Sequence, residues 1–276
     1  MSNDWEPLEP DIKTILSADP DPLRSLAGGE TPAIVFRNAY SEADSTGLID
    51  RFIEKGLIVD SSGPDAGGQK KRIDIGTSLA QRGNDQEAFF EHAMETKKLF
   101  GTLFDGFANP VTFIYESLAA LDVNKQVVTA HEKDDREYGP AIFRTHYEGH
   151  RYPPHIDHVT LREKRFDYEV SRFKHQFAGV LCMQNTATTG QATQAILHRC
   201  FWNEEVQPHI ANDSFYNYAA DNDIPKFQVD LEPGDLYFFN TGLIHEVPAL
   251  EGDDPRIVLA VFIGYSEDDP EIFVWS

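Results

Sequence analysis

The hydrophobic periodicity of this chain changes near Pro140, and that change limits the available folds more than any other feature. After Pro140 come short runs of alternating or continuous apolar residues, typical of strands: AIFRTHYEG, FAGVLCMQN, KFQVDL, LYFFN and RIVLAVFIGY. Glycine, proline, aspartate and asparagine separate these runs, as expected for turns. Helical patterns followed by successive short strands predict a mainly β, α+β fold, namely a β-sandwich or jelly-roll barrel with flanking helices.

Two helical zones precede Pro140. The first spans 41–56 and places four large apolar residues on one helical face: Leu48, Ile49, Phe52 and Ile53. Ser41 or Ser45 can cap its start, and Gly56 is placed to end it. The second spans about 85–121, with aromatic residues recurring at spacings of three and four, and Pro110 interrupts it. Both zones predict helices that pack against the β-rich part.

The domain organisation follows from the same patterns. Residues 1–30 are rich in Asp, Pro and Glu with little periodicity, which predicts an extended or partly ordered N-terminal arm. We expect residues 31–276 to form a single domain, with 31–139 as mostly helical support and 140–276 as the jelly-roll core. A hydrophobic content of 41% is sufficient to fill such a core.

The charge balance limits the classes of partner. A formal net charge of −22 repels phosphate backbones and anionic lipid surfaces, so nucleic acid and membranes are poor candidates. The two cysteines, Cys182 and Cys200, lie among apolar residues and predict free, buried thiols in a reducing compartment. No secretory signal or membrane span is recognisable. We therefore expect a soluble, cytoplasmic protein that acts on a small molecule as a monomer or homodimer.

The stretch HRYPPHIDHVT, residues 150–160, is a candidate for half of a metal site. In an extended chain alternate side chains share a face, so His155 and Asp157 point the same way. Pro153 and Pro154 stiffen the approach to them. An imidazole and a carboxylate side by side can occupy two adjacent positions around a metal. Such a triplet is common, however, and a third ligand from a distant strand is needed.

The stretch LEPGDLYFFNTGLIHEVPAL, residues 231–250, contains the third candidate ligand, His245. Arg256 follows eleven residues later and begins an apolar strand. A buried guanidinium requires an anion, because burying it alone costs several kcal/mol. Two interpretations are open: Arg256 pairs with Asp253 or Asp254, or it binds the carboxylate of a small acid in a bidentate manner.

The ordered set of candidates resembles the Fe(II)- and 2-oxoglutarate-dependent oxygenases: His155, Asp157, His245 and Arg256. The pattern of that family is His-X-Asp, a long gap, His, about ten residues and then Arg. The resemblance covers roughly residues 140–266. It includes FRTHYEG before the first ligands and PGDLYFF before the distal histidine. The family fold is a double-stranded β-helix, a jelly-roll barrel, which agrees with the strand pattern.

The resemblance implies roles for these residues. His155, Asp157 and His245 would hold Fe(II) and leave positions for 2-oxoglutarate and O2, and Arg256 would bind the distal carboxylate of 2-oxoglutarate. Tyr147 is the candidate for a hydroxyl that assists Arg256. The implied reaction is dioxygenase chemistry that converts 2-oxoglutarate to succinate and CO2 while oxidising an unactivated C–H bond.

Two departures from the family pattern bear on the substrate and the outcome. The segment NTATTGQATQAIL, residues 185–197, lacks the Gly-Gly of many relatives and implies a different loop. The chain end, GYSEDD and EIFVWS, resembles the free-standing aliphatic halogenases and related oxygenases of alkaloid pathways. Those halogenases carry Gly or Ala where this chain has Asp157, so hydroxylation, desaturation or ring closure is expected instead. An amino acid or a natural-product intermediate is the expected substrate.

Two other functions remain open at this stage. One is a cupin-like metal enzyme that uses the same ligands without 2-oxoglutarate, and the other is a non-catalytic barrel. Nearby histidines and arginines are expected to be surface, hydrogen-bonded or ion-paired residues: His146, His150, His158, Arg144, Arg151 and Arg162. For the three arginines, contact with a substrate carboxylate is the alternative. His158 is the substitute ligand if Asp157 does not serve. His198 and His209 lie in a region that could line a substrate pocket.

Overall fold

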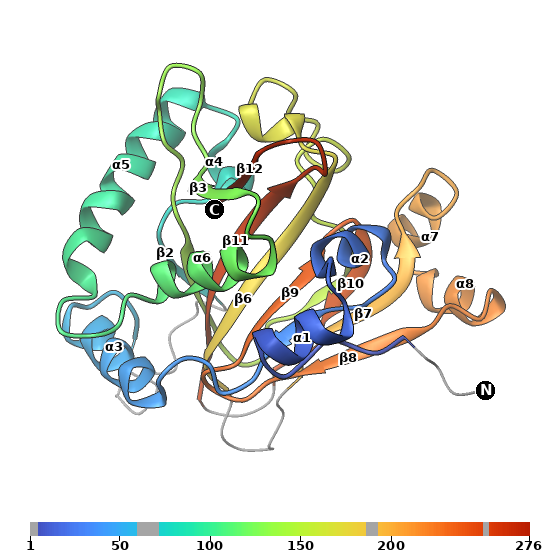
Figure 1. Ribbon diagram of the computed structural model, residues 1–276, viewed down its shortest axis with the longest axis horizontal. Helices are drawn as coiled ribbons and strands as arrows, with labels where there is room; N and C mark the ends of the chain where they lie inside the picture. The colour runs from blue at the N-terminus through green and yellow to red at the C-terminus, as the bar shows by residue number, and fades with distance from the viewer. Residues whose placement is uncertain (1–4, 60–71, 186–192, 251–253) are drawn as a thin grey trace.

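The computed structural model describes residues 5–59, 72–185, 193–250 and 254–276, and within these ranges the strands form two sheets (Figure 1). The larger sheet has the strand order β1 (Ile34–Phe36), β9 (Leu236–Asn240), β6 (His175–Gln184), β11 (Arg256–Tyr265), β12 (Glu271–Trp275) and β3 (Gln126–Thr129). It also includes β4 (Ile142–His146), which pairs with β11, and β2 (Arg72–Ile75), which pairs with β4. All pairings are antiparallel except that of β12 with β3.

The smaller sheet has the order β5 (Tyr152–His155), β10 (Leu243–Val247), β7 (Thr193–Phe201) and β8 (Lys226–Asp230). It packs against the inner face of the larger sheet, because side chains from both sheets meet in one apolar cluster. That cluster joins Ala178 and Phe239 of the larger sheet to Leu197 and Val229 of the smaller one. The architecture is therefore two facing, mainly antiparallel sheets, and no hydrogen-bonded closure into one barrel is seen in the described ranges.

Helices cover the outer face of the larger sheet (Figure 1). The helical elements are α1 (Ile12–Ala18), α2 (Pro22–Gly28), α3 (Glu42–Glu54), α4 (Leu79–Arg82), α5 (Gln86–Leu103), α6 (Pro110–Leu121), the 3-10 helix η1 (Glu169–Arg172), α7 (Gln207–Ala211) and α8 (Phe215–Asp221). Buried side chains of α1, α2, α3, α5 and α6 share one core cluster with the outer face of the larger sheet. Within the described ranges, none of the helices combines the length and apolar character that a membrane span requires.

Both helical zones predicted before Pro140 are present. Ser41 caps α3, because its side chain accepts a hydrogen bond from the Asp44 amide. The second zone is divided into α5 and α6, and Pro110 begins α6 rather than simply ending α5. Proline is tolerated there because the first turn of a helix has no internal partner for its amide. The Asn109 side chain accepts from the next two free amides.

The N-terminal segment, expected to be extended or partly ordered, contains the seven-residue helices α1 and α2. Their apolar side chains, Ile15, Leu23 and Leu26, are buried in the main core. The Trp5 indole donates to the carbonyl of Gly29 at 3.0 Å. The segment 5–30 is therefore packed onto the sheets along its length.

The five strand segments predicted after Pro140 correspond to β4, β6, β8, β9 and β11. The loop expected over 185–197 is only partly visible, because residues 186–192 lie outside the described ranges. From Thr193 the chain is already in β7, so the end of that expectation was wrong. The β-branched run of β11 pairs with β6, β4 and β12 and forms the centre of the larger sheet.

Candidate metal centre and its cavity

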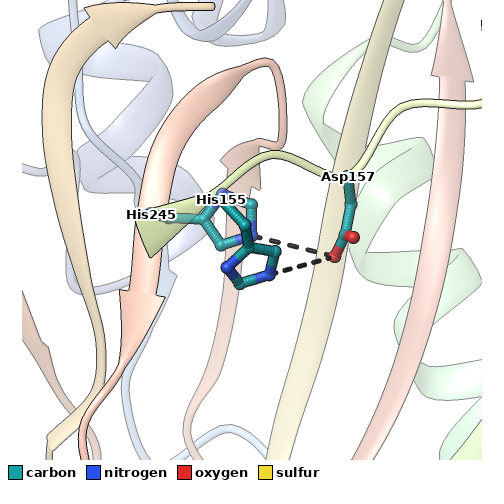
Figure 2. Close-up of side chains that lie close together, drawn as sticks. All are labelled: His155, Asp157 and His245. Atoms are coloured by element: carbon teal, nitrogen blue, oxygen red, sulfur yellow. Dashed lines mark ion pairs between the residues drawn. The ribbon is translucent and has the colours of Figure 1, made fainter. Parts of the chain in front are cut away.

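Three of the predicted site residues lie together where the two sheets face each other. His155 ends β5 and lies directly opposite His245 of β10 in the antiparallel register. Asp157 follows two residues after His155, and its amide donates to the carbonyl of Thr241 at 3.1 Å. One oxygen of Asp157, Oδ2, lies 3.7 Å from His155 Nε2 and 3.8 Å from His245 Nε2 (Figure 2). One potential ligand atom from each residue lies within 4.8 Å of the others.

Backbone carbonyls fix the orientation of both imidazoles. His155 Nδ1 lies 2.8 Å from the carbonyl oxygen of Pro153, and His245 Nδ1 lies 2.9 Å from that of Leu243. A carbonyl only accepts, so each Nδ1 carries the proton and donates it. In the neutral tautomer that this hydrogen bond selects, Nε2 carries the lone pair, and in both rings Nε2 faces Asp157. Two imidazole nitrogens and a carboxylate in this arrangement match the two-histidine, one-carboxylate set of non-haem Fe(II) sites.

Electrostatics favour the ligand forms of Asp157 and His245. Burial raises the pKa of the Asp157 carboxyl, but the facing His155 and His245 outweigh burial and hold that pKa well below its usual range. Burial lowers the pKa of His245, and the neighbouring His155 lowers it further. These shifts favour an ionised Asp157 and a neutral His245, which are the forms that bind metal.

Arg162 and Gln176 support Asp157 from the side away from the histidines. The Arg162 guanidinium pairs with Asp157 Oδ1 and also donates to the carbonyl of Ile156 at 2.8 Å. The Gln176 side chain donates to the carbonyl of Asp157 at 3.2 Å. These contacts leave Oδ2 directed at the histidines.

A cavity of about 310 Å³ lies beside this group, between the two sheets. His155, Asp157 and His245 form part of its wall, and Arg256 forms another part. Much of the remaining wall is apolar and comes from the inner face of the larger sheet. The cavity is large enough for small molecules and adjoins the candidate ligands.

Arg256 has the properties of an anion-binding residue. Its side chain is buried, Nη1 donates to the carbonyl of Gln194 at 3.3 Å, and Nη2 lies 3.4 Å from His146 Nδ1. Its Nε is buried without a hydrogen-bond partner. Within the part of the chain that the structure describes, no carboxylate lies at ion-pair distance from Arg256. Of the two aspartates proposed as partners of Arg256, Asp253 lies outside the described residues. Burial lowers the pKa of the guanidinium.

Tyr147 is not brought into this group. Its hydroxyl lies 3.4 Å from both the amide and the carbonyl oxygen of Val59, and its side chain is not part of the cavity wall. The tyrosine that does line the cavity in this segment is Tyr152, whose hydroxyl accepts a hydrogen bond from Arg72.

The other histidines of the region have different surroundings. His158 Nδ1 accepts from the Thr160 amide at 3.2 Å, and burial lowers the pKa of His158 to about 4. His198 contacts Glu246 at 3.1 Å and His209 lies on α7, and neither is part of the cavity wall. Neither histidine lines this cavity, and a role for their region in a substrate pocket stays a prediction.

Two further residues line the cavity, His146 and Arg144. His146 was expected to be a surface or hydrogen-bonded residue, and Arg144 an ion-paired residue with contact to a substrate carboxylate as the alternative. The alternating pattern of β4 indicates this placement, because Ile142, Arg144 and His146 lie on the same face of the strand. His146 is buried, and burial together with Arg256 holds its pKa well below the usual value. It is therefore a neutral neighbour of the buried guanidinium.

Comparisons with known proteins concern the family and the fold. The family model described as carrier-protein-independent halogenase WelO5 matches residues 6–276. Among solved structures, an N-substituted L-amino acid dioxygenase from Burkholderia ambifaria AMMD is 16% identical, with a TM-score of 0.60 over 92% of this chain and 90% of that chain. The same enzyme in complex with alpha-KG is 14% identical, with a TM-score of 0.59 and the same coverage. At these identities the likeness concerns the fold. No curated protein matches the chain significantly.

Proposed function

The chain belongs to the family of the carrier-protein-independent halogenase WelO5, within the Fe(II)- and 2-oxoglutarate-dependent oxygenases, and we propose that it oxidises an unactivated C–H bond of a small molecule by hydroxylation. Family membership agrees with the resemblance found in the sequence. It also sets aside the cupin-like enzyme and the non-catalytic barrel. We further infer that the two sheets are those of a double-stranded β-helix, with residues 1–30 as an arm and 31–276 as one domain.

We propose that His155 Nε2, Asp157 and His245 Nε2 hold Fe(II). The support is the convergence of the three side chains and the tautomer that the carbonyls of Pro153 and Leu243 impose. Rings held in this way need no reorientation to bind a metal. When bound, iron and 2-oxoglutarate supply the oxidant for the C–H bond from O2, and the cosubstrate becomes succinate and CO2.

Arg256 is the residue that we assign to the distal carboxylate of 2-oxoglutarate. Its guanidinium is buried, its Nε lacks a partner, and it lines the same cavity as the metal group. A buried cation without an anion is costly, and a dicarboxylate that reaches it would remove that cost. The neutral His146 beside it adds no competing positive charge.

Other residues of the chain orient the Asp157 carboxylate and exclude water from the cavity. Arg162 holds one oxygen of Asp157, so the carboxylate keeps a fixed direction. The apolar wall formed by Val180, Val258 and Ala260 limits water beside the reacting C–H bond.

The observation that carries the choice of hydroxylation is the position of Asp157. Its carboxylate faces both histidines at 3.7 and 3.8 Å, so it occupies the place that the resembling halogenases leave open with Gly or Ala. With Asp157 bound to iron, the coordination position that a halide uses in those halogenases is filled. The product of the reaction is therefore expected to carry oxygen and not halogen.

Chloride titration tests this choice without knowledge of the substrate. The protein is loaded anaerobically with Fe(II) and 2-oxoglutarate, and the visible absorption band is followed as chloride is added. We expect no change in the wild type and a saturable shift in Asp157→Gly, which opens a ligand position. A saturable chloride-dependent shift in the wild type would favour halogenation over hydroxylation.

A further inference from the structure

The cavity contains a second guanidinium without an anion, that of Arg144. This residue lies in the middle of β4, opposite Val258 of β11, and lines the cavity. Its Nε is buried without a hydrogen-bond partner. Within the described ranges, the Arg144 side chain makes no hydrogen bond or ion pair, and Asp74, which lies opposite Arg144 on β2, pairs with Arg72 instead. Its Cζ lies 6.0 Å from the centroid of the Phe262 ring.

The other arginines and carboxylates of the cavity wall form ion pairs within the protein. Arg72 pairs with Asp74 and contacts Tyr152, and Arg162 pairs with Asp157. Glu163 pairs with Arg165 and is not available to Arg144. Two guanidiniums therefore remain without a protein anion, those of Arg256 and Arg144.

Two arginines without an acidic partner are unusual in a chain with a formal net charge of −22. With 46 acidic residues against 24 Lys and Arg, an arginine meets a carboxylate easily on the surface. A cavity wall that instead keeps two cations free attracts an anion from solution and holds it strongly, because the local dielectric is low. Each free guanidinium matches one planar carboxylate in a bidentate manner.

The surroundings of Arg144 are apolar and partly small. Ile142 precedes it on the same face of β4, and Val258 and Ala260 are nearest on β11. Ala178 and Val180 of β6 continue this wall. Such a surface accepts an aliphatic or aromatic body beside the charged group. A phosphate monoester carries close to two negative charges, of which one guanidinium neutralises one, so this site favours a monocarboxylate.

We propose that the primary substrate is a small carboxylic acid with an apolar body, whose carboxylate binds Arg144 while Arg256 binds 2-oxoglutarate. This inference rests on the proposed oxygenase function and adds the substrate class to it. Arg144 then determines specificity by fixing one end of the substrate, so that its apolar end lies along the cavity wall.

The test uses matched pairs of acids and their primary amides: 3-phenylpropanoic acid, 4-methylpentanoic acid and N-acetyl-leucine. Binding to the anaerobic Fe(II) and 2-oxoglutarate complex is followed through the visible band and by calorimetry. We expect at least one acid to bind the wild type about tenfold or more tightly than its amide. In Arg144→Gln that preference is expected to disappear, with the Kd of the acid raised by about 10- to 100-fold. Arg144→Lys is expected to restore part of the preference, because it keeps the charge without the planar fork.

Arg151→Gln is the matched control, since it removes the same charge from an exposed position outside the cavity. We expect it to keep the preference for the acid. Circular dichroism and an unchanged Kd for 2-oxoglutarate establish that Arg144→Gln is folded and loaded.

Three results would overturn the inference. The first is that no acid binds the wild type better than its amide, and the second is that Arg144→Gln retains the preference. The third is loss of 2-oxoglutarate binding in Arg144→Gln with retention in Arg256→Gln, which would reverse the two roles. If the wild type itself formed no complex with Fe(II) and 2-oxoglutarate, the proposed function would fail first, and that result is distinguishable from the other three.

Discussion

His155 and His245 lie opposite each other on the paired strands β5 and β10, with ring centroids 4.3 Å apart. Their closeness is a consequence of strand register, because a slip of one residue would turn one ring to the other side of the sheet. The backbone carbonyls that hold each Nδ1 belong to the same two strands. The pairing of two strands far apart in the sequence thus sets both the spacing and the tautomer of the candidate ligands.

Replacement of one imidazole is expected to abolish tight metal binding. In His245→Ala, only one nitrogen and one carboxylate remain to bind Fe(II). Loss of a supporting contact around a metal costs about 10- to 100-fold in affinity, and we expect loss of a ligand to cost at least that much. Anaerobic equilibrium dialysis against Fe(II) measures the change. His158→Ala is the control and should bind as the wild type does, and weakened binding in that variant would point to His158 as a ligand.

Removal of the Arg256 charge is expected to have opposite effects on stability and on binding. In Arg256→Met, loss of a buried cation without an anion should raise the free energy of unfolding of the ligand-free protein by about 1 to 4 kcal/mol. The Kd for 2-oxoglutarate should rise at least about 100-fold in the same variant. Urea unfolding and calorimetry measure the two quantities. A destabilised variant with unchanged affinity would indicate a structural role for Arg256.

The aromatic contact between helices and sheet is expected to contribute to stability and not to the site. Phe143 is fully buried, and its ring packs against those of Phe52, Phe100 and Phe104. We expect Phe143→Ala to lower the free energy of unfolding by about 3 to 5 kcal/mol. Val123, which is 83% exposed, provides the control, and Val123→Ala should change that free energy by less than about 0.5 kcal/mol. Metal affinity of folded Phe143→Ala should be unchanged, because Phe143 faces away from the cavity.

The two thiols are expected to differ in reactivity. Burial raises the pKa of Cys182 far above its usual value, and the thiolate is the reactive form. Cys200 is only partly buried, and its pKa is raised by burial as well. A thiol reagent at pH 8 should therefore modify Cys200 slowly and leave Cys182 intact until the protein is unfolded. Mass spectrometry of the labelled protein identifies the site, and rapid labelling of native Cys182 would contradict its burial.

Periodicity predicted those parts of the fold that are long and regular. The apolar face of α3, the division at Pro110 and the continuous run of β11 each contain enough residues for a clear pattern. The helices α1 and α2 have only seven residues each, and β1 has three. Such segments are defined by tertiary packing, and a single sequence does not contain that information.

The candidate site was predictable only where ligands follow a linear pattern. His155, Asp157, His245 and Arg256 were found by order and spacing, whereas the contact of Arg256 with His146 depends on the pairing of β11 with β4. Tyr147 was the hydroxyl expected beside Arg256. In the structure, Tyr147 follows the last residue of β4 and lies against Val59, so its side chain leaves the cavity. That Arg144 lacks an acidic partner could not be predicted before the fold was known.

Anaerobic addition of Fe(II) and 2-oxoglutarate tests the central claim most directly, with the weak metal-to-ligand band in the middle of the visible range as the readout. The account predicts a saturable band in the wild type, its loss in His155→Ala, and a large increase in the 2-oxoglutarate concentration needed to form it in Arg256→Gln. Bound iron without a 2-oxoglutarate-dependent band, or a band that persists in His155→Ala, would contradict the assignment of the cosubstrate or of the metal centre.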